Sequence, residues 1–306
     1  MQPSLQTETE RQTPRIRLLR AAHAQEVANY LSRDVVRNLF MLSWLDNYGV
    51  SAPGRPDLFH FRGIFAAGTL VGVALTITDR LVLLQTDDAE TARRFGRWYR
   101  DNGYRFEHVV STRRCVTPFW AAYSAAPDDG IRARLDRPQE LHVLQRSHWD
   151  AIGGARHVAT PGDVRLASTA DRDAVFWASA KMHAEETLED PLERNAGHFR
   201  RHVEHRIDNG RTYVWFDDHR RLLFKADVSA QSPYGVQVSG VYTPPALRGR
   251  GLATRGMLGV CNALFARGFP RVTLYVNRSN APARRVYEKV GFEYHTAYQT
   301  VFVEQA

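Results

Sequence analysis

The chain has 306 residues, of which 43% are hydrophobic and 24% charged, and its formal net charge is +8. These values are typical of a globular protein, and the length favours two domains over one. No apolar run approaches the roughly 20 residues that a membrane-spanning helix needs, so we expect no membrane partner. The two cysteines, Cys115 and Cys261, lie far apart, which argues against a disulfide framework and predicts a cytoplasmic protein.

The positive charge rests almost wholly on arginine, because lysine occurs only at Lys181, Lys225 and Lys289. A basic balance predicts an anionic partner, either a phosphorylated coenzyme or nucleic acid. Nucleic-acid binding calls for a dense basic stripe interleaved with aromatic residues. The arginines here are scattered among acidic residues, so the composition favours the coenzyme.

Residues 15–150 are predicted to form a first domain, preceded by a disordered lead-in at residues 1–14 that lacks an apolar secretory core. Hydrophobic spacing and turn residues predict its elements in chain order. These are a strand at 16–20, a helix over 24–48, two strands within 61–77 joined at Ala67-Gly68, a strand at 81–86, a helix over 89–103, a strand at 105–112, a short helix at 115–123 and one or two strands at 131–144.

Residues 151–163 are rich in glycine and turn formers and are predicted to be a linker to a second domain at 164–306. The expected elements of this domain follow the same order. They are a strand at 164–168, helices over 171–186 and 193–209, a meander of strands at 212–218, 220–229 and 234–243, a glycine-rich loop, a helix ending near 268, a strand at 271–277, a helix over 280–289 and a terminal strand or pair at 292–303. The shared outline indicates an internal duplication.

Each half therefore reads as an α/β (α+β) unit, with a mixed, mostly antiparallel sheet flanked by helices. In the second half, Arg248, Gly249, Arg250 and Gly251 come directly before a helix. Glycine lets the backbone approach a ligand closely, and a helix start presents unpaired N–H groups. This stretch is therefore predicted to bind a phosphate group.

The corresponding turn of the first half contains Asp87, Asp88 and Glu90 instead. Carboxylates stabilise a helix start but repel a phosphate. We therefore expect one anion site per chain, in the second half.

Two motifs carry a resemblance to a known family. Residues 248–253, Arg-Gly-Arg-Gly-Leu-Ala, fit the Arg/Gln-X-X-Gly-X-Gly/Ala signature of the GNAT N-acyltransferase superfamily. The family's second hallmark is matched by Leu274, Val276, Asn280, Ala283, Tyr287, Gly291 and Phe292. The match covers roughly residues 160 to 306. The whole chain also resembles a bacterial subgroup in which an uncharacterised, degenerate GNAT-like domain precedes a complete one.

The resemblance implies an acetyl-CoA-dependent N-acetyltransferase that transfers an acetyl group to a primary amine. Backbone N–H groups from Arg248 to Thr254 would bind the pyrophosphate, and the edge at residues 241–243 would pair with the pantetheine arm. The implied coenzyme-binding residues are Val241, Tyr242, Thr243, Arg248, Gly249, Arg250, Gly251, Leu252, Ala253, Thr254, Asn277 and Asn280. No cysteine is placed as a nucleophile, so we expect direct transfer in a ternary complex.

Tyr287 is the residue that the resemblance assigns to protonation of the departing thiolate. A phenol with a pKa near 10 keeps its proton at neutral pH and can give it to a thiolate as charge develops there. The alternative is that Tyr287 only packs on the helix face that it shares with Ala283 and Val290.

The general base is less well defined by the sequence. Many family members carry Glu where this chain has Gln237, which cannot accept a proton. Glu185 or Glu186, at the end of a helix that lines the acceptor pocket in the family, is our candidate, although a solvated helix end is the slightly better explanation of two adjacent glutamates. The change at Gln237 keeps open an alternative function, a non-catalytic acyl-CoA-binding sensor or interaction module.

Three histidines on one predicted helix, His198, His202 and His205, have a spacing that can suit a metal. Their arginine neighbours would repel a cation, so we expect a solvated basic face and no metal. The identity of the acceptor, whether a small-molecule or a protein amine, and the formation of a homodimer are left open by the sequence.

Overall fold

The computed structural model describes residues 15–55, 57–125, 130–157 and 164–304. The predicted lead-in at 1–14 and part of the predicted linker, 158–163, lie outside the described residues. The helices of the described chain are α1 (Ala24–Leu31), α2 (Val35–Tyr48), α3 (Ala89–Asp101), α4 (Arg113–Tyr123), α5 (Arg146–Ala151), α6 (Arg172–Thr187), α7 (Pro191–Asp208), α8 (Leu252–Ala266) and α9 (Ala281–Val290).

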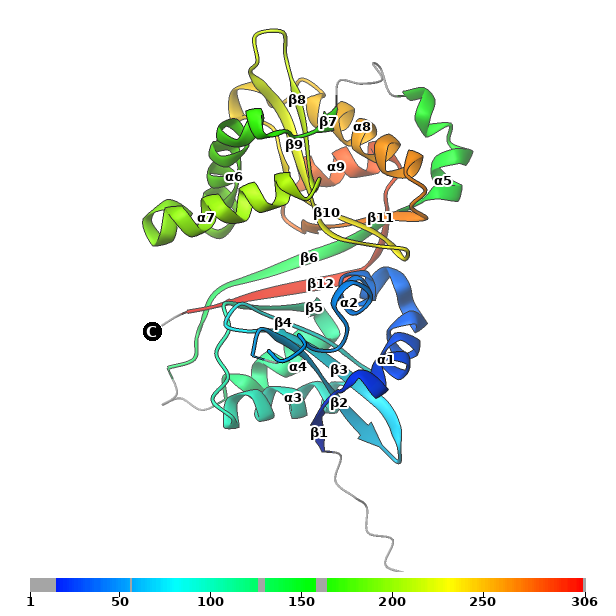
Figure 1. The fold of residues 1–306 in the computed structure, drawn as a ribbon, viewed down its shortest axis with the longest axis vertical. Helices are drawn as coiled ribbons and strands as arrows, with labels where there is room; N and C mark the ends of the chain where they lie inside the picture. Colours follow the sequence, from blue (N-terminus) through cyan, green and yellow to red (C-terminus); the bar gives the residue numbers. More distant parts are fainter. Residues whose placement is uncertain (1–14, 56, 126–129, 158–163, 305–306) are drawn as a thin grey trace, which may run out of the picture.

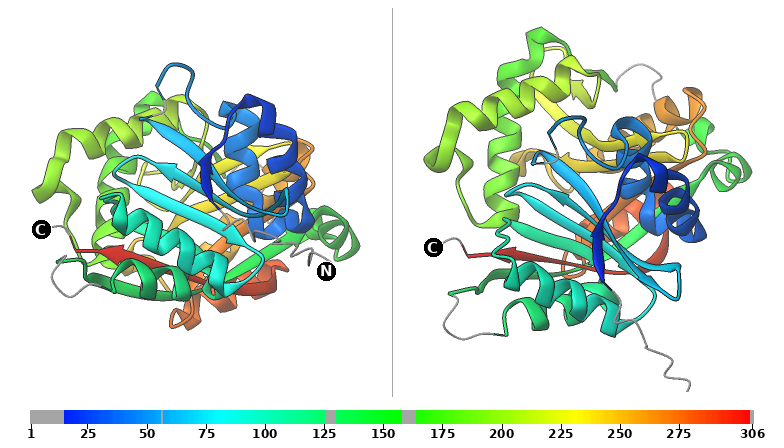
Figure 2. Two further views of the ribbon diagram at one scale, coloured as in Figure 1. Left: turned by 90° about the horizontal axis from the view of Figure 1, so that it is seen from below. Right: turned by 60° about the horizontal axis from the view of Figure 1, so that its bottom comes forward.

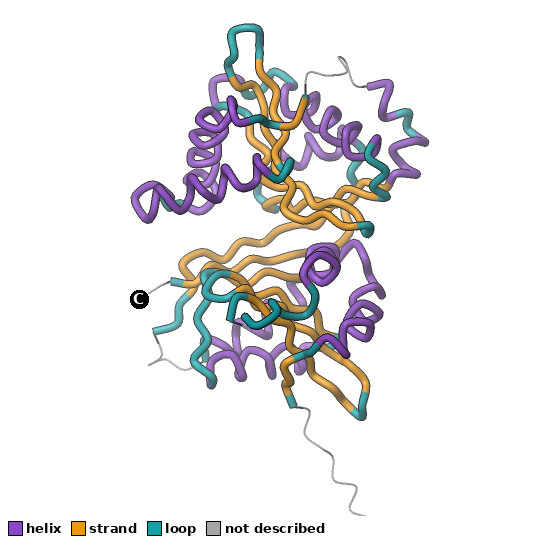
Figure 3. The backbone as a smooth tube through the Cα atoms, viewed as in Figure 1, coloured by secondary structure: helices purple, strands orange, loops and turns teal. Residues whose placement is uncertain are grey.

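The strands form one continuous twelve-stranded sheet, in the order β1-β2-β3-β4-β5-β12-β6-β11-β10-β9-β8-β7 (Figures 1 and 3). They are β1 (Ile16–Leu18), β2 (Phe59–Ala66), β3 (Thr69–Ile77), β4 (Leu81–Thr86), β5 (His108–Thr112), β6 (Ala133–Gln145), β7 (Arg165–Leu166), β8 (Thr212–Phe216), β9 (Leu222–Ser232), β10 (Gly235–Tyr242), β11 (Arg271–Asn277) and β12 (Glu293–Val303). The pairs β4–β5 and β10–β11 are parallel, and the other described pairs are antiparallel. The predicted mixed, mostly antiparallel α/β fold is confirmed.

The centre of the sheet is built by an exchange of strands between the two halves of the chain. β12, the last strand, pairs with β5 of the first half and with β6. β6, from the first half, pairs on its other side with β11 along the whole length of β11. Both strands cross the middle of the molecule in Figure 1. Each half therefore uses a strand of the other to complete its sheet.

The two faces of the sheet are covered by different helices. Alternate residues of a strand point to opposite faces. Leu144 of β6 belongs to the core cluster formed with α8 and α9, whereas Leu141 belongs to the cluster formed with α1 and α2. In the second half α6 and α7 pack on the face opposite α8, around Val214. Figure 2 shows the corresponding layers of the first half, with α1 and α2 on one face and α3 and α4 on the other.

Two predicted elements differ in detail from the structure. The helix expected over 24–48 is interrupted by a 3-10 turn at Ser32–Asp34, where the Asp34 carboxylate accepts the Arg37 N–H at 3.0 Å and starts α2. The carboxylate also pairs with His295 on β12 at 3.0 Å. The predicted linker begins inside α5 and continues into a short 3-10 turn at Gly154–His157. Gly154 in this turn packs directly against the ring of Trp149, which belongs to the core of the second half, so the described residues 151–157 are packed structure.

Candidate active site

A cleft of about 710 Å³ opens between β10 and β11. The two strands pair only from Val236 to Val238, opposite Val272 to Leu274. Beyond this point β10 contains an irregularity between Ser239 and Tyr242, while β11 continues along β6. The strands therefore diverge, and the edge of β10 that faces the cleft is left without a partner strand.

Gly240 lies at this irregularity and has a positive φ of 57°. A Cβ at this position would lie 2.3 Å from the Asp227 carboxylate and 3.2 Å from the Lys225 Nζ. Lys225 donates to the Gly240 carbonyl at 3.1 Å and to Asp227 at 2.7 Å. Both the backbone conformation and the close approach of the charged pair therefore require glycine here.

The charged pair beside the β10 irregularity is almost fully buried, with Lys225 0% and Asp227 2% exposed. Burial lowers the pKa of Lys225, and the Asp227 charge opposes that effect. Burial alone would raise the pKa of Asp227, but Lys225 and Arg206 outweigh it and hold that pKa below its usual value. Arg206 and Thr212 also donate to the Asp227 carboxylate, at 2.8 and 2.9 Å. These hydrogen bonds satisfy a group whose burial would otherwise be costly.

The glycine-rich loop lies at one end of the cleft, before α8. Gly249 and Gly251 have φ values of 79° and 76°, and a Cβ at either position would meet no atom within 4 Å. The left-handed conformation rather than crowding therefore requires glycine. No side chain caps the start of α8, so its first N–H groups remain free to bind a ligand.

Most of the predicted coenzyme-binding residues line this cleft. They are Val241, Tyr242, Thr243, Arg248, Gly249, Gly251, Leu252, Ala253, Thr254, Asn277 and Asn280. Arg250 is exposed and is not among the lining residues. The Asn280 side-chain oxygen accepts the Ala283 N–H at 3.1 Å and caps α9, which leaves its amide NH2 group for another partner.

Thr243, at the end of β10, has a buried hydroxyl with no hydrogen-bond partner among the described residues. It lines the cleft beside the unpaired edge of β10. A buried polar atom of this kind is destabilising unless a ligand or water satisfies it. The edge and the hydroxyl together fit an extended polar chain that pairs with β10 like an added strand.

Tyr287 lies on α9, is 6% exposed and lines the cleft. Its ring packs edge-on against Phe292, with 5.9 Å between the ring centroids. Burial and, to a lesser extent, the Glu186 charge raise the pKa of its hydroxyl well above the usual value. Tyr287 therefore stays protonated at neutral pH and both packs in the core and faces the cleft.

Glu185 and Glu186 lie in the last turn of α6, and both line the cleft. Glu185 is bound by Arg248, whose guanidinium donates to its carboxylate at 2.7 Å. The Glu186 side chain is exposed to solvent within the cleft, but the walls of the cleft surround its carboxyl and partly desolvate it. This desolvation raises the pKa of Glu186 despite the opposing charges of Arg137 and Lys225. The two neighbours therefore differ, because Glu185 is engaged in an ion pair and Glu186 has the properties of a proton acceptor.

Gln237 does not line the cleft. Its side chain is buried and donates to the Ser229 hydroxyl at 3.1 Å, within the continuous part of the sheet. Sequence reasoning missed Arg137 and Gln139, two cleft-lining residues that β6 brings from the first half. No local motif marks them, because their position depends on the strand exchange.

The junction of the first half that corresponds to the glycine loop is closed by its own side chains. The Asp88 carboxylate accepts the Thr91 N–H at 2.7 Å and caps α3. The Tyr30 hydroxyl donates to the Asp87 carboxylate at 2.9 Å, and Arg114 donates to the backbone carbonyl of Asp87 at 2.6 Å. The helix start that would face a phosphate is thus occupied by a carboxylate.

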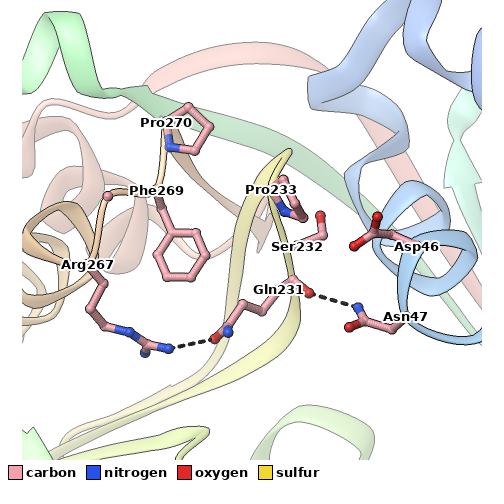
Figure 4. Close-up of a pocket in the computed structure, with 9 residues that line it drawn as sticks. Asp46, Asn47, Gln231, Ser232, Pro233, Arg267, Phe269 and Pro270 are labelled. Carbon is pink, nitrogen blue, oxygen red and sulfur yellow. Dashed lines mark hydrogen bonds between the residues drawn. The ribbon is translucent and has the colours of Figure 1, made fainter.

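A second cavity, of about 410 Å³, lies at the seam between α2, the β9–β10 turn and the start of β11 (Figure 4). The Asn47 amide donates to the Gln231 carbonyl at 2.9 Å, and Arg267 donates to the Gln231 side chain at 3.2 Å. None of the residues that line it was predicted to belong to a site. This cavity is bordered by contacts that join the two halves.

The predicted histidine face of α7 is strongly basic in the structure. Burial, followed by the charges of Arg206 and Arg80, lowers the pKa of His202 to about 3. Within the described chain no group of three or more His, Cys, Asp and Glu side chains is arranged to hold a metal ion. Among the described helices, none is long and apolar enough to cross a membrane.

The part of the chain that resembles known proteins contains most of the residues that line the cleft. The acetyltransferase (GNAT) family matches residues 177–292. A mycothiol acetyltransferase of Nocardioides sp. is 38% identical over 88 residues, which are 28% of this chain and 29% of that protein. A mycothiol acetyltransferase of Clavibacter michiganensis is 28% identical over 166 residues, which are 52% of each protein. The chain thus spans about half or less of the curated relatives that it matches.

Among solved structures, a tandem GNAT protein from the clavulanic acid biosynthesis pathway resembles almost the whole chain. The superposition has a TM-score of 0.54 at 15% identity and covers 95% of this chain and 98% of that one. At this identity the likeness concerns the fold alone, and it covers both halves of the chain.

Proposed function

We propose that the chain is an acetyl-CoA-dependent N-acetyltransferase that acts on a primary amine, on the basis of the match of residues 177–292 to the acetyltransferase (GNAT) family. On this proposal residues 164–306 are the acyltransferase domain and residues 15–150 a degenerate relative of it. The observation that carries the proposal is the single cleft lined by the glycine loop, Tyr287 and Glu186. The names of the curated relatives favour acetyl as the transferred group.

The glycine loop and the start of α8 would hold the pyrophosphate of the coenzyme with backbone N–H groups. The free edge of β10, with the unsatisfied Thr243 hydroxyl, would hold the pantetheine arm, and the Asn280 amide would bind it from α9. Arg248 is fixed by the Thr243 carbonyl at 3.0 Å and by Glu185, so it orders the loop while it adds positive charge.

Glu186 and Tyr287 would supply the proton transfers. As the amine nitrogen bonds to the thioester carbonyl carbon, Glu186 accepts the proton that nitrogen loses, directly or through a water. As the carbon–sulfur bond breaks and its electron pair goes to sulfur, Tyr287 donates its proton there. The raised pKa of Tyr287 keeps that proton available, and the raised pKa of Glu186 makes it a stronger base than a carboxylate with the usual pKa.

The first half would not bind a second coenzyme. Its helix start is capped by Asp88, and Asp87 lies beside it. Negative charge at this position opposes a phosphate. We therefore expect one acetyl-CoA per chain.

The rival function, an acyl-CoA sensor without catalysis, rests on the glutamine at position 237. Because Gln237 is buried outside the cleft lining, its identity bears little on proton transfer in the cleft. An acetylated product from any amine separates the enzyme from the sensor.

Titration calorimetry with acetyl-CoA and a panel of amines tests the proposal. We expect about one site per chain, release of the coenzyme thiol that depends on the amine, and the mass of the acetylated product. The Arg248→Asp/Gly249→Ala double variant should lose binding, whereas Arg132→Asp, a charge reversal at an exposed residue outside the cleft lining, should keep it. Unaltered affinity of the double variant would refute the assignment of the loop.

A further inference from the structure

The acceptor side of the cleft is built in part by the first half of the chain. Tyr287 and α9 pack on one face of the sheet, together with Val276. Tyr275, the next residue along β11, packs on the opposite face against Tyr298. Since Tyr287, Val276 and Tyr275 all line the cleft, the cleft reaches both faces of the sheet. On the face of the sheet away from α9, which we call the second mouth, the cleft is lined by Glu186 on α6 and by Arg137 and Gln139 on β6.

Most cations around this mouth are already paired. Arg134 lies 3.1 Å from the Glu189 carboxylate and donates to the Thr187 carbonyl at 2.7 Å. Lys225 and Arg206 share the Asp227 carboxylate. Arg248 holds Glu185.

Arg137 is different. Within the described residues it forms no ion pair and no hydrogen bond, and its guanidinium lies 5.5 Å from the centre of the Phe302 ring. The side chain is half-buried, and burial lowers its pKa, although Glu186 opposes the effect. A guanidinium remains charged under all physiological conditions, and its five N–H donors in a planar fork suit a bidentate oxyanion.

Gln139 places a second donor beside this arginine. Residues two apart on a strand point to the same face. The Thr300 hydroxyl donates to the Gln139 side-chain oxygen at 2.6 Å, which fixes the orientation of the amide and leaves its NH2 group for the cleft. A guanidinium and an amide NH2 on one wall form a donor set suited to an oxyanion.

We propose that Arg137 and Gln139 bind an oxyanionic group of the acceptor, such as a carboxylate or a phosphate, so that the enzyme selects acidic or zwitterionic amines. The proposal rests on the proposed function and specifies its substrate class. In this arrangement Glu186, on α6, faces the amino group of the acceptor, and Arg137, on β6, faces its oxyanion. The two charges of a zwitterion would thus each meet a side chain of opposite charge. The first half thereby acts in substrate selection through β6.

Paired acceptors test this inference. Each acidic amine is compared with its neutral partner: an amino acid with its amide, and phosphoethanolamine with ethanolamine. A hydrogen-bonded charge pair of this kind is worth about ten- to hundred-fold in kcat/KM. We expect the wild-type protein to prefer one acidic member by about that factor. The preferred pair identifies the oxyanion.

Arg137→Gln should abolish the preference, mainly by raising KM for the acidic member, with the KM of acetyl-CoA unchanged. Arg137→Lys should retain part of it, since the charge remains and the planar fork is lost. Arg132→Gln is the matched control, because it removes the same charge from an exposed residue outside the cleft lining. This control should keep the wild-type preference.

Equal kcat/KM for both members of every pair in the wild-type protein would overturn the inference. The inference would also fail if Arg137→Gln lowered kcat/KM equally for the acidic and the neutral member of a pair. Arg137 would then act only through the pKa of Glu186 and would not contact the oxyanion. Should acetyl-CoA bind and no amine be acetylated, the proposed function fails separately. In that case calorimetry of the acidic amines with the coenzyme-loaded protein decides: binding lost in Arg137→Gln supports the oxyanion site, and no binding in wild type refutes it.

Discussion

Replacement of Glu186 by glutamine is the most direct test of the chemistry assigned to the cleft. The substitution keeps the shape of the side chain and removes its capacity to accept a proton. General base catalysis contributes about 10²- to 10⁴-fold, so kcat for Glu186→Gln should fall by a factor in that range. The affinity for acetyl-CoA should stay within about twofold, because on our proposal the glycine loop and the free edge of β10, and not Glu186, hold the coenzyme.

The pH dependence of kcat/KM tests the same assignment, because the loss of the Glu186 base should lower kcat/KM as the pH falls. Burial raises the pKa of Glu186 above its usual value of 4.5, so the carboxylate that acts as base is lost as the pH falls through this raised pKa. The acceptor amine also loses its neutral form on acidification, by tenfold for each pH unit. We therefore expect log kcat/KM to fall with a slope of one at first and with a slope of two below the pKa of Glu186. The slope for Glu186→Gln should remain at one throughout.

Glu185→Gln is the matched control, one residue away on the same helix. Glu185 forms an ion pair with Arg248 at 2.7 Å, and both side chains are about half exposed. An exposed pair of this kind contributes about 0–1 kcal/mol, so the control should weaken acetyl-CoA binding by no more than about fivefold and should keep the slope of two. Wild-type turnover in Glu186→Gln, or loss of the second slope in Glu185→Gln instead, would refute the assignment of the base.

The remaining predictions concern the proton donor, the buried charges and the electrostatics of the mouth. Tyr287→Phe should lower kcat with the acetyl-CoA dissociation constant unchanged, as measured by calorimetry; unchanged turnover would show that Tyr287 only packs. Asp227→Asn should reduce the free energy of unfolding in urea by about 3–5 kcal/mol, because buried Lys225 loses its counter-charge. The Lys225→Met/Asp227→Leu double variant should lose less. Arg137→Gln should move the acid limb of kcat/KM to higher pH, since the Arg137 charge lowers the pKa of Glu186; an unmoved limb would contradict that coupling.

Much of the fold could be predicted because its signals are local. The bounds of β4 and β11 agree with the apolar runs that predict them, and the glycine-rich loop lies directly before α8, as the sequence indicates. Hydrophobic spacing did not reveal the break between α1 and α2. It depends on the Asp34 carboxylate, which caps α2 and pairs with His295, 261 residues further along the chain.

The residues of the candidate site could be predicted from the sequence only where they belong to one local motif. The sequence could not distinguish Glu185 from Glu186, since the difference comes from Arg248, which engages Glu185, and from the surrounding protein, which raises the pKa of Glu186. Nothing in the sequence likewise indicated that Lys225 donates a hydrogen bond to the Gly240 carbonyl. Each of these roles depends on contacts between residues that are distant in the sequence.

The strand exchange explains how a half without a phosphate-binding loop can still take part in the site. β6 leaves the first half and runs between β12 and β11, so that Gln139 lies opposite Asn277, where β11 ends at the cleft. Arg137 follows two residues further along the same face. Two sheets closed separately would leave this wall of the mouth without either side chain. The proposed specificity for an oxyanion therefore follows from the topology: on this proposal the second half would supply the coenzyme loop and the proton carriers, and the first half would supply the cation that meets the acceptor.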